Sequence, residues 1–133
     1  MAKEAPTVTV AVDDSGGTAR SIENDITGLD WAIPRAVQDV TGVDKAAIER
    51  LLLLSDFSLT MNGVFNDASN VSHDVLKTVA SATASRTVTI VTSGQTLPNE
   101  VFITDYSMSR GSDGSLTWSA PAVLQSGTAP TWA

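Results

Sequence analysis

The sequence predicts a mainly β protein, an antiparallel β-sandwich or barrel with one flanking α-helix. Six or seven short segments are rich in β-branched residues and alternate apolar with polar side chains. Only one segment keeps a helical spacing of apolar residues. The strands and this helix do not alternate as a parallel sheet would require. With 133 residues, we expect one domain spanning 1–133.

The N-terminal quarter predicts strands joined by a turn. Residues 7–12, TVTVAV, alternate and are β-branched, and residues 13–17, DDSGG, form a turn cluster. The two acids belong to this turn rather than to a calcium loop, because the other ligands of such a loop are missing. Two further strand-like pieces lie within residues 18–33, and Pro34 should end the second.

Residues 35–52 predict an excursion from the sheet. The first part is polar and has no sustained period, which is typical of an ordered loop. In residues 44–52, Ile48, Leu51 and Leu52 have helical spacing, so we expect a short helical or irregular turn there. The alternative is one amphipathic helix running through all four leucines of LLLL, followed by a shorter strand.

Residues 53–65 predict a long strand with one buried and one hydrated face. Phe57, Leu59 and Met61 fall on the inward side of the alternation. The other side has no lysine, arginine or large hydrophobic residue. In a monomer it is a solvated sheet face, and in a ring of subunits it would line a channel. Its members are Asp56, Ser58, Thr60 and Asn62.

Residues 69–82 predict the one helix. Ser72 is a candidate N-cap, and Asp74 suits the positive end of the helix dipole. An apolar stripe at helical spacing predicts packing against a sheet; it comprises Val75, Leu76, Val79 and Ala80.

The remaining chain predicts three strands and an irregular tail. The strands are expected at 86–92, 101–108 and 115–123. Asp113 and Gly114 indicate a hairpin between the last two. Residues 125–133 have no regular pattern.

Charge and residue types exclude several functions. Fifteen acidic against eight basic residues give a formal charge of −7, and the basic residues are scattered, which argues against tight DNA binding. There is no cysteine, and His73 has no partner histidine for a metal site. We therefore expect no enzyme activity, no metal and no cofactor. No apolar run approaches transmembrane length, and the N-terminus lacks a secretory signal, so we expect synthesis in the cytoplasm.

The three tryptophans allow a different function. Trp31 and Trp118 lie in predicted strands and should fill the core or a subunit interface. Trp132 should pack on a neighbouring subunit or fold back onto the sheet edge. If these rings were exposed, the protein would instead be a monomeric β-sandwich binding module for a glycan or a protein.

Three segments resemble the major tail proteins, or tail tube proteins, of long-tailed bacteriophages. They are DVTGVDKAAIERLLLLSDFSLTMNGVFN (39–66), SHDVLKTV (72–79) and DGSLTWSAPAVLQSGTAPTW (113–132). In that family, a β-sandwich with one helix forms hexameric rings, which stack into a tube. One sheet from each subunit joins its neighbours in a barrel around the lumen.

The resemblance implies a structural protein of the virion tail, made in the bacterial host cytoplasm. Its partners would be copies of itself, the tape measure, tail terminator and distal tail proteins, and double-stranded DNA in transit, with no membrane involved. The lumen would be lined by Asp56, Ser58, Thr60 and Asn62. Contacts between subunits or rings would come from Arg35, Asp39, Asp44, Lys45, Arg50 and Trp132.

Overall fold

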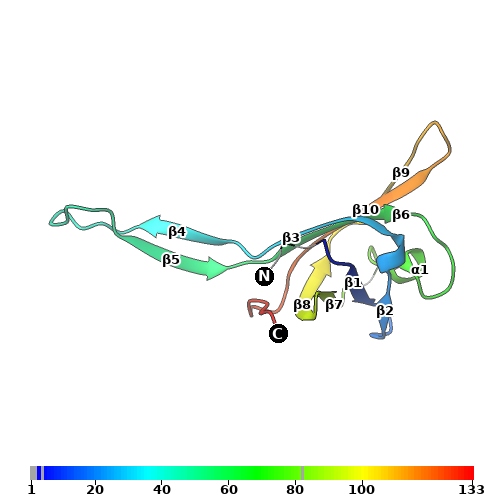
Figure 1. The fold of residues 1–133 in the computed structure, drawn as a ribbon, viewed down its shortest axis with the longest axis horizontal. Helices are drawn as coiled ribbons and strands as arrows, with labels where there is room; N and C mark the ends of the chain where they lie inside the picture. Colours follow the sequence, from blue (N-terminus) through cyan, green and yellow to red (C-terminus); the bar gives the residue numbers. More distant parts are fainter. Residues whose placement is uncertain (1–2, 4, 82) are drawn as a thin grey trace.

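The computed structural model describes residues 3, 5–81 and 83–133, and it consists of a curled antiparallel sheet with a long projecting hairpin (Figure 1). The sheet has the order β2–β1–β7–β8–β10–β6–β3, and β9 also pairs with β10. A separate two-stranded sheet, β4–β5, forms the hairpin. The predicted fold class, antiparallel β with one α-helix, is confirmed.

The N-terminal strands follow the predicted pattern. β1 spans Val8–Asp13, β2 spans Ala19–Ser21, and β3 spans Ile26–Ala32 after a short 3-10 turn at Glu23–Asp25. Asp14 organises the turn between β1 and β2, because its carboxylate accepts hydrogen bonds from the backbone of Gly16 and Thr18. Turn chemistry thus accounts for this acid.

The excursion is a β-hairpin, which corrects the prediction for this region. β4 spans Arg35–Asp39 and β5 spans Arg50–Ser55. The helical or irregular turn expected at 44–52 is wrong at its C-terminal end, and so is the alternative helix through LLLL. Four consecutive leucines fit a helix or a strand equally well, and pairing with β4 decides in favour of the strand.

The long strand expected at 53–65 is divided. β6 spans Ser58–Val64, and Asp56 and Phe57 lie between it and β5. The Asp56 carboxylate accepts a hydrogen bond from the Phe57 amide, and the Asp56 amide donates to the carbonyl of Pro34 at 2.9 Å. Phe57 is fully buried. These contacts fix the junction between hairpin and sheet.

The helix is shorter than predicted. α1 spans Ser72–Leu76, followed by turns, and Val71 rather than Ser72 occupies the N-cap position. The Ser72 amide donates to the carboxylate of the buried Asp25 at 3.2 Å. A residue 47 positions away therefore caps this helix, which its local sequence does not reveal.

The predicted apolar stripe of the helix is realised only in part. Val75 and Leu76 are fully buried, and Val79 packs against the core from the turns after α1. Ala80 is exposed. The helix and the turns that follow it therefore cover the sheet through three of the four expected residues.

The C-terminal half contains four strands. β7 spans Arg86–Thr92, as predicted. The strand expected at 101–108 is wrong in both bounds: β8 spans Gln95–Ile103 and β9 spans Ser107–Arg110. β10 spans Leu116–Leu124, and the expected hairpin turn places Gly114 at φ +92°.

The core lies inside the curl of the sheet and beneath α1. Its larger fully buried side chains come from four strands, the 3-10 turn region, the β5–β6 junction and the helix: Val10, Val12, Ile22, Phe57, Leu59, Met61, Val75, Leu76, Val88, Ile90, Leu97 and Val101. Within the described residues, no helix has the length and apolar content needed to cross a membrane.

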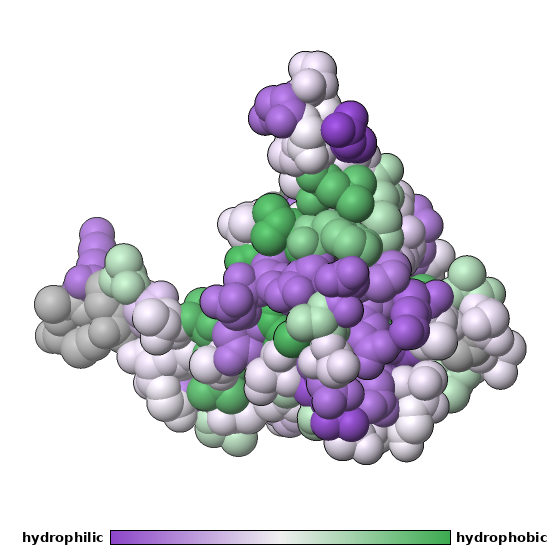
Figure 2. Space-filling model, turned by 90° about the vertical axis from the view of Figure 1, so that its right-hand side faces the viewer, coloured by the Kyte–Doolittle hydropathy of each residue, from purple (hydrophilic) through white to green (hydrophobic). Residues whose placement is uncertain are grey.

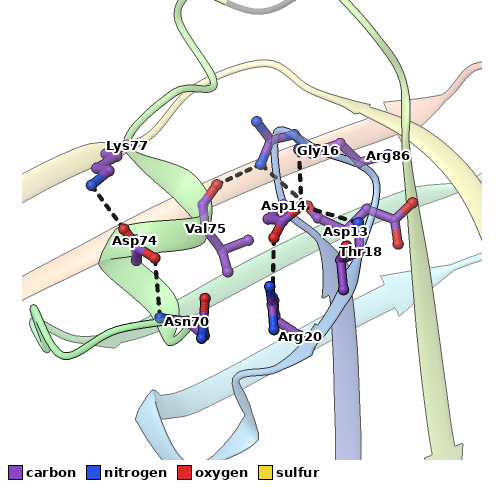
Figure 3. A network of polar contacts seen from close by, with 10 residues as sticks. All are labelled: Asp13, Asp14, Gly16, Thr18, Arg20, Asn70, Asp74, Val75, Lys77 and Arg86. Carbon is purple, nitrogen blue, oxygen red and sulfur yellow. Dashed lines mark hydrogen bonds and ion pairs between the residues drawn. The ribbon is translucent and has the colours of Figure 1, made fainter.

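A buried arginine ties the helix region to β1 (Figure 3). The Arg86 guanidinium donates to the carbonyls of Val75 and Asp13 and to the hydroxyl of Thr78. Burial lowers the pKa of Arg86, and the charges of Asp14 and Asp13 oppose that shift. The carbonyl of Val75, near the end of the short helix, thus finds a donor inside the protein.

Candidate functional site: a polar sheet face and an apolar arm

The outer face of four neighbouring strands carries a group of polar residues and no cationic side chain; the same register also places Val64, Pro121 and Val123 on this side. In β6, Leu59 and Met61 are buried, whereas Ser58, Thr60 and Asn62 point to the other side. Strand pairing places further polar residues beside them. We call this surface the polar face; its members are Asp30, Ser58, Thr60, Asn62, Ser107, Ser109, Thr117 and Ser119.

The polar face follows directly from strand register. Asp30 of β3 lies opposite Thr60, and Ser119 of β10 lies opposite Asn62. Ser107 of β9 in turn lies opposite Ser119. Directly opposed residues share one side of a sheet, so the outward polar positions of all four strands form one surface.

A shallow hollow of about 330 Å³ lies in this surface. Gly63 allows the sheet to pack closely there, because a Cβ at this position would lie 2.3 Å from the carbonyl oxygen of Asp25 and 2.6 Å from the Trp118 ring. The Trp118 indole is buried and donates to the carbonyl of Val64 at 2.9 Å. The hollow is lined by Thr27, Asn62, Gly63, Ser107, Met108, Ser109, Thr117, Trp118 and Ser119.

The structure places the four candidate lumen residues in two settings. Ser58, Thr60 and Asn62 belong to the polar face within β6, and Asp56 is exposed at the junction between β5 and β6. Sequence reasoning missed the contributions of β3, β9 and β10. Only the pairing of strands distant in sequence reveals those.

The hairpin is the second feature of the candidate site. We call residues 35–55, which comprise β4, β5 and their connection, the arm, and the rest of the described chain the body. The arm extends away from the body along the longest axis of the molecule (Figure 1). Seven large apolar side chains are exposed along it: Val37, Val40, Val43, Ile48, Leu51, Leu52 and Leu54.

Some of the charged residues predicted to make contacts between subunits instead hold the arm together. The Arg35 guanidinium donates to the carbonyl of Leu53 at 2.8 Å. The Asp39 carboxylate accepts hydrogen bonds from the hydroxyl and the amide of Thr41, which lower its pKa.

The other three charged candidates lie on the arm surface. Lys45 and Asp44 approach to 4.0 Å, and Arg50 lies opposite Asp39 in the hairpin. Contact with another subunit remains a prediction for all five. The exposed leucines, which the sequence shows as LLLL, were not among the predicted contacts.

Trp132 folds back onto the sheet, one of the two arrangements expected for it. Its ring centroid lies 6.3 Å from that of Trp31 in β3. Ala133 exchanges two backbone hydrogen bonds with Thr96 of β8, of 2.8 and 2.9 Å. The indole of Trp132 is still 45% exposed.

The described residues contain no group of three or more His, Cys, Asp or Glu side chains that could hold a metal ion. His73 is half-buried, and its Nδ1 lies 3.1 Å from the Tyr106 hydroxyl. Burial and the charge of Asp25 raise the pKa of Tyr106. This cluster packs next to Phe65 and Trp118, which indicates a structural role.

Comparison with solved structures identifies the fold. The chain superposes on one from the tail of an empty gene transfer agent (GTA) particle with C6 symmetry, with a TM-score of 0.78, 14% identity and 95% of each chain covered. A chain from the virion of a native GTA particle superposes with a TM-score of 0.74 and 13% identity, with 93% of this chain and 95% of that chain covered. The fold is that of phage-tail-type proteins, which confirms the resemblance at the level of fold.

A third structure has the same architecture. A chain of the anti-feeding prophage baseplate, 6-fold symmetrised, gives a TM-score of 0.67 and 15% identity, with 100% of this chain and 97% of that chain covered. No family model matches the sequence, and no curated protein matches it significantly. These comparisons therefore establish a likeness of fold.

Proposed function

We propose that this protein is a tail tube subunit, which assembles into stacked hexameric rings around a conduit for DNA. The observation that carries the proposal is the polar face, a broad sheet surface that presents hydroxyl, amide and carboxylate groups without a lysine or arginine. DNA in transit must not adhere to the wall, and cationic side chains would bind its phosphates. Carboxylates repel phosphates weakly over about 10 Å at moderate salt.

The strand edges support ring formation. Among the described residues, β3 ends the large sheet and β9 pairs only with β10, so the strands that carry the polar face have a free edge on each side. Antiparallel pairing makes β3 run with β10 and β9 run with β6. β9 of one copy against β3 of the next would therefore continue the antiparallel order. Closing a ring in this way removes exposed edges.

The fold of the three solved structures supports the same role, since they come from a GTA tail, a GTA virion and a prophage baseplate, two of them described with six-fold symmetry. The proposal places the protein in the virion tail, without enzymatic activity. Trp31 and Trp132 contact one another and Trp118 is buried, so these rings offer less support for a glycan-binding module.

The test adds cations to the polar face. We expect the pure protein to form rings or tubes in electron micrographs. When Ser58→Lys/Thr60→Lys protein assembles in the presence of duplex DNA, the DNA sedimenting with the tubes should rise about tenfold in a salt-sensitive manner and resist nuclease. The matched control is Thr89→Lys, on the outer side of β7, whose bound DNA should stay nuclease-sensitive.

Two results would contradict the proposal separately. A parent chain that remains monomeric at every concentration argues against self-assembly. Tubes whose DNA retention does not change with Ser58→Lys/Thr60→Lys argue against this surface as the lumen wall.

A further inference from the structure

A groove of about 350 Å³ lies in the body between β1 and β3, near the two ends of the curled sheet. We call it the seam groove. Pairing between β2 and β1 covers Ala11–Asp13, so the first half of β1 lies beyond that pairing and borders the groove. Apolar side chains of both strands line most of it: Val8, Val10, Ile26, Leu29 and Trp31. Except for Val10, these side chains are only partly buried, so this margin of the core stays open to solvent.

The seam groove also contains a carboxylate that lacks a partner. Glu23, in the 3-10 turn just before β3, is one of its lining residues. The Oε2 atom of Glu23 is buried, and among the described residues it has no hydrogen-bond partner. An ionised oxygen removed from water is unfavourable unless a cation or a donor faces it. The groove therefore suits a ligand that combines an apolar part with a positive charge.

β9 presents an apolar and a cationic side chain on one side. Met108 lies opposite the buried Trp118, so Met108 and Arg110 lie on the side of the sheet away from the polar face. Met108 is 42% exposed, and Arg110 is exposed as well. The β9–β10 hairpin projects from the body, and apolar side chains gather below its polar tip (Figure 2). Both side chains are thus free to reach another molecule.

The charge of Arg110 is not used within the chain. Arg110 is the single basic residue in the four strands that carry the polar face. Elsewhere in the body, Arg20 and Lys77 form ion pairs. Within the described part of the chain, the Arg110 guanidinium forms no hydrogen bond or ion pair. An unpaired guanidinium on one copy and an unpaired carboxylate on another are complementary.

Strand geometry can bring these groups together in a ring. With β9 of one copy antiparallel to β3 of the next, the two serines of β9 continue the polar face, while Met108 and Arg110 point toward the seam groove. In this pairing β9 runs toward the start of β3. Arg110 therefore lies nearer than Met108 to Glu23, which precedes β3 in the chain.

We propose that Met108 and Arg110 of one copy fill the seam groove of the neighbouring copy, where Arg110 forms an ion pair with Glu23. The inference rests on the proposed ring and names the side chains that select the partner strand. Backbone pairing at a sheet edge gives affinity, and pockets for alternate side chains give specificity. The groove thus determines which strand edge is accepted and in which register.

A charge exchange tests the contact. Glu23→Arg alone and Arg110→Glu alone each set like charges against one another at every contact, so the protein concentration at which rings appear should rise at least about tenfold. In an equal mixture of the two variants, alternating chains set opposite charges together at every contact. The mixture should therefore assemble near the concentration of the parent, and native mass spectrometry should find equal numbers of both chains in each ring.

The matched control is Glu100→Arg, which makes the same charge change in β8, away from both free edges of the sheet. Its assembly should follow that of the parent. Urea denaturation of each monomer checks that the variants fold. An ion pair within one chain could not be restored by mixing, so recovery in the mixture is specific to a contact between copies.

The outcomes separate the inference from the proposed function. Rings formed by either single variant at the parent concentration would overturn the ion pair and leave the ring intact. Folded variants whose mixture does not recover would also overturn it. Recovery of the mixture in oligomers that are not rings would support the contact and count against the tube. A parent chain that stays monomeric at every concentration would contradict both.

Discussion

In β6, Leu59 and Met61 are fully buried while Ser58 and Thr60 face outward, whereas in β5 Leu51 and Leu52 face opposite sides and are equally exposed. Strands of similar length thus serve different purposes in body and arm. The alternating strand is completed by the core of its own chain. The apolar ribbon has no core of its own, and its exposed side chains are free to contact other molecules. Stability of the monomer should therefore depend on the body alone.

We expect the largest loss of stability from a substitution at the junction where body and arm meet. Phe57→Ala should lower the free energy of unfolding by about 4 kcal/mol, because it removes a fully buried aromatic ring and leaves a cavity. Urea denaturation of the monomer measures this loss. A change close to zero would show that the junction lies outside the cooperative core.

Low pH should affect the stability contributions of body and arm differently. Hydrogen bonds from the Thr18 amide, the Arg20 side chain and the Gly16 amide lower the pKa of Asp14 from its ordinary 3.8. A depressed pKa gives stability that is present above 3.8 and lost as pH falls through the folded-state value. The difference in urea midpoint between the parent and Asp14→Asn should therefore shrink at low pH.

Asp39→Asn is the matched control in the arm. The Asp39 pKa is also depressed, by Thr41, but the arm should lie outside the global unfolding transition. We expect no difference in midpoint at any pH for this variant. A difference in urea midpoint as large as that of Asp14→Asn would mean that arm and body unfold together.

We expect the smallest change in the monomer's free energy of unfolding from a substitution on the exposed apolar surface of the arm. Leu54→Ser replaces a leucine that is 92% exposed, so the monomer's free energy of unfolding should change by no more than about 0.5 kcal/mol. Denaturation and assembly, measured on one preparation, test this. A stability loss comparable to that of Phe57→Ala would place Leu54 in a core that the monomer already forms.

The body was predictable wherever local patterns carry the information. The alternation in β6, the turn at Asp14 and the Asp113–Gly114 hairpin all follow from short-range rules. Three of the eight residues of the polar face, Ser58, Thr60 and Asn62, could be placed in this way. The contributions of β3, β9 and β10 depend on strand pairing, which local reasoning does not supply.

The errors arise where distant residues decide the local structure. Asp25 caps α1 from across the chain, and Val71 rather than the predicted Ser72 is the N-cap residue. Pro98 made the first half of β8 hard to predict as a strand. The sheet tolerates this proline because β10 pairs only with the later part of β8, from Val101. The four leucines of LLLL fit the period of a helix and that of a strand, and only their pairing with β4 shows that they form a strand.

The junction at Pro34 and Asp56 has a mechanical consequence. β3 leads into β4 and β5 leads into β6 across two-residue breaks, and the backbone hydrogen bond from Asp56 to Pro34 clamps the two chains together there. The anchored Phe57 leaves little freedom for a hinge. The arm and strands β3 and β6 therefore act as one lever. A force applied at the tip is transmitted to the strands that carry Ser58 and Thr60, so bending of an assembled filament would be felt at its inner surface.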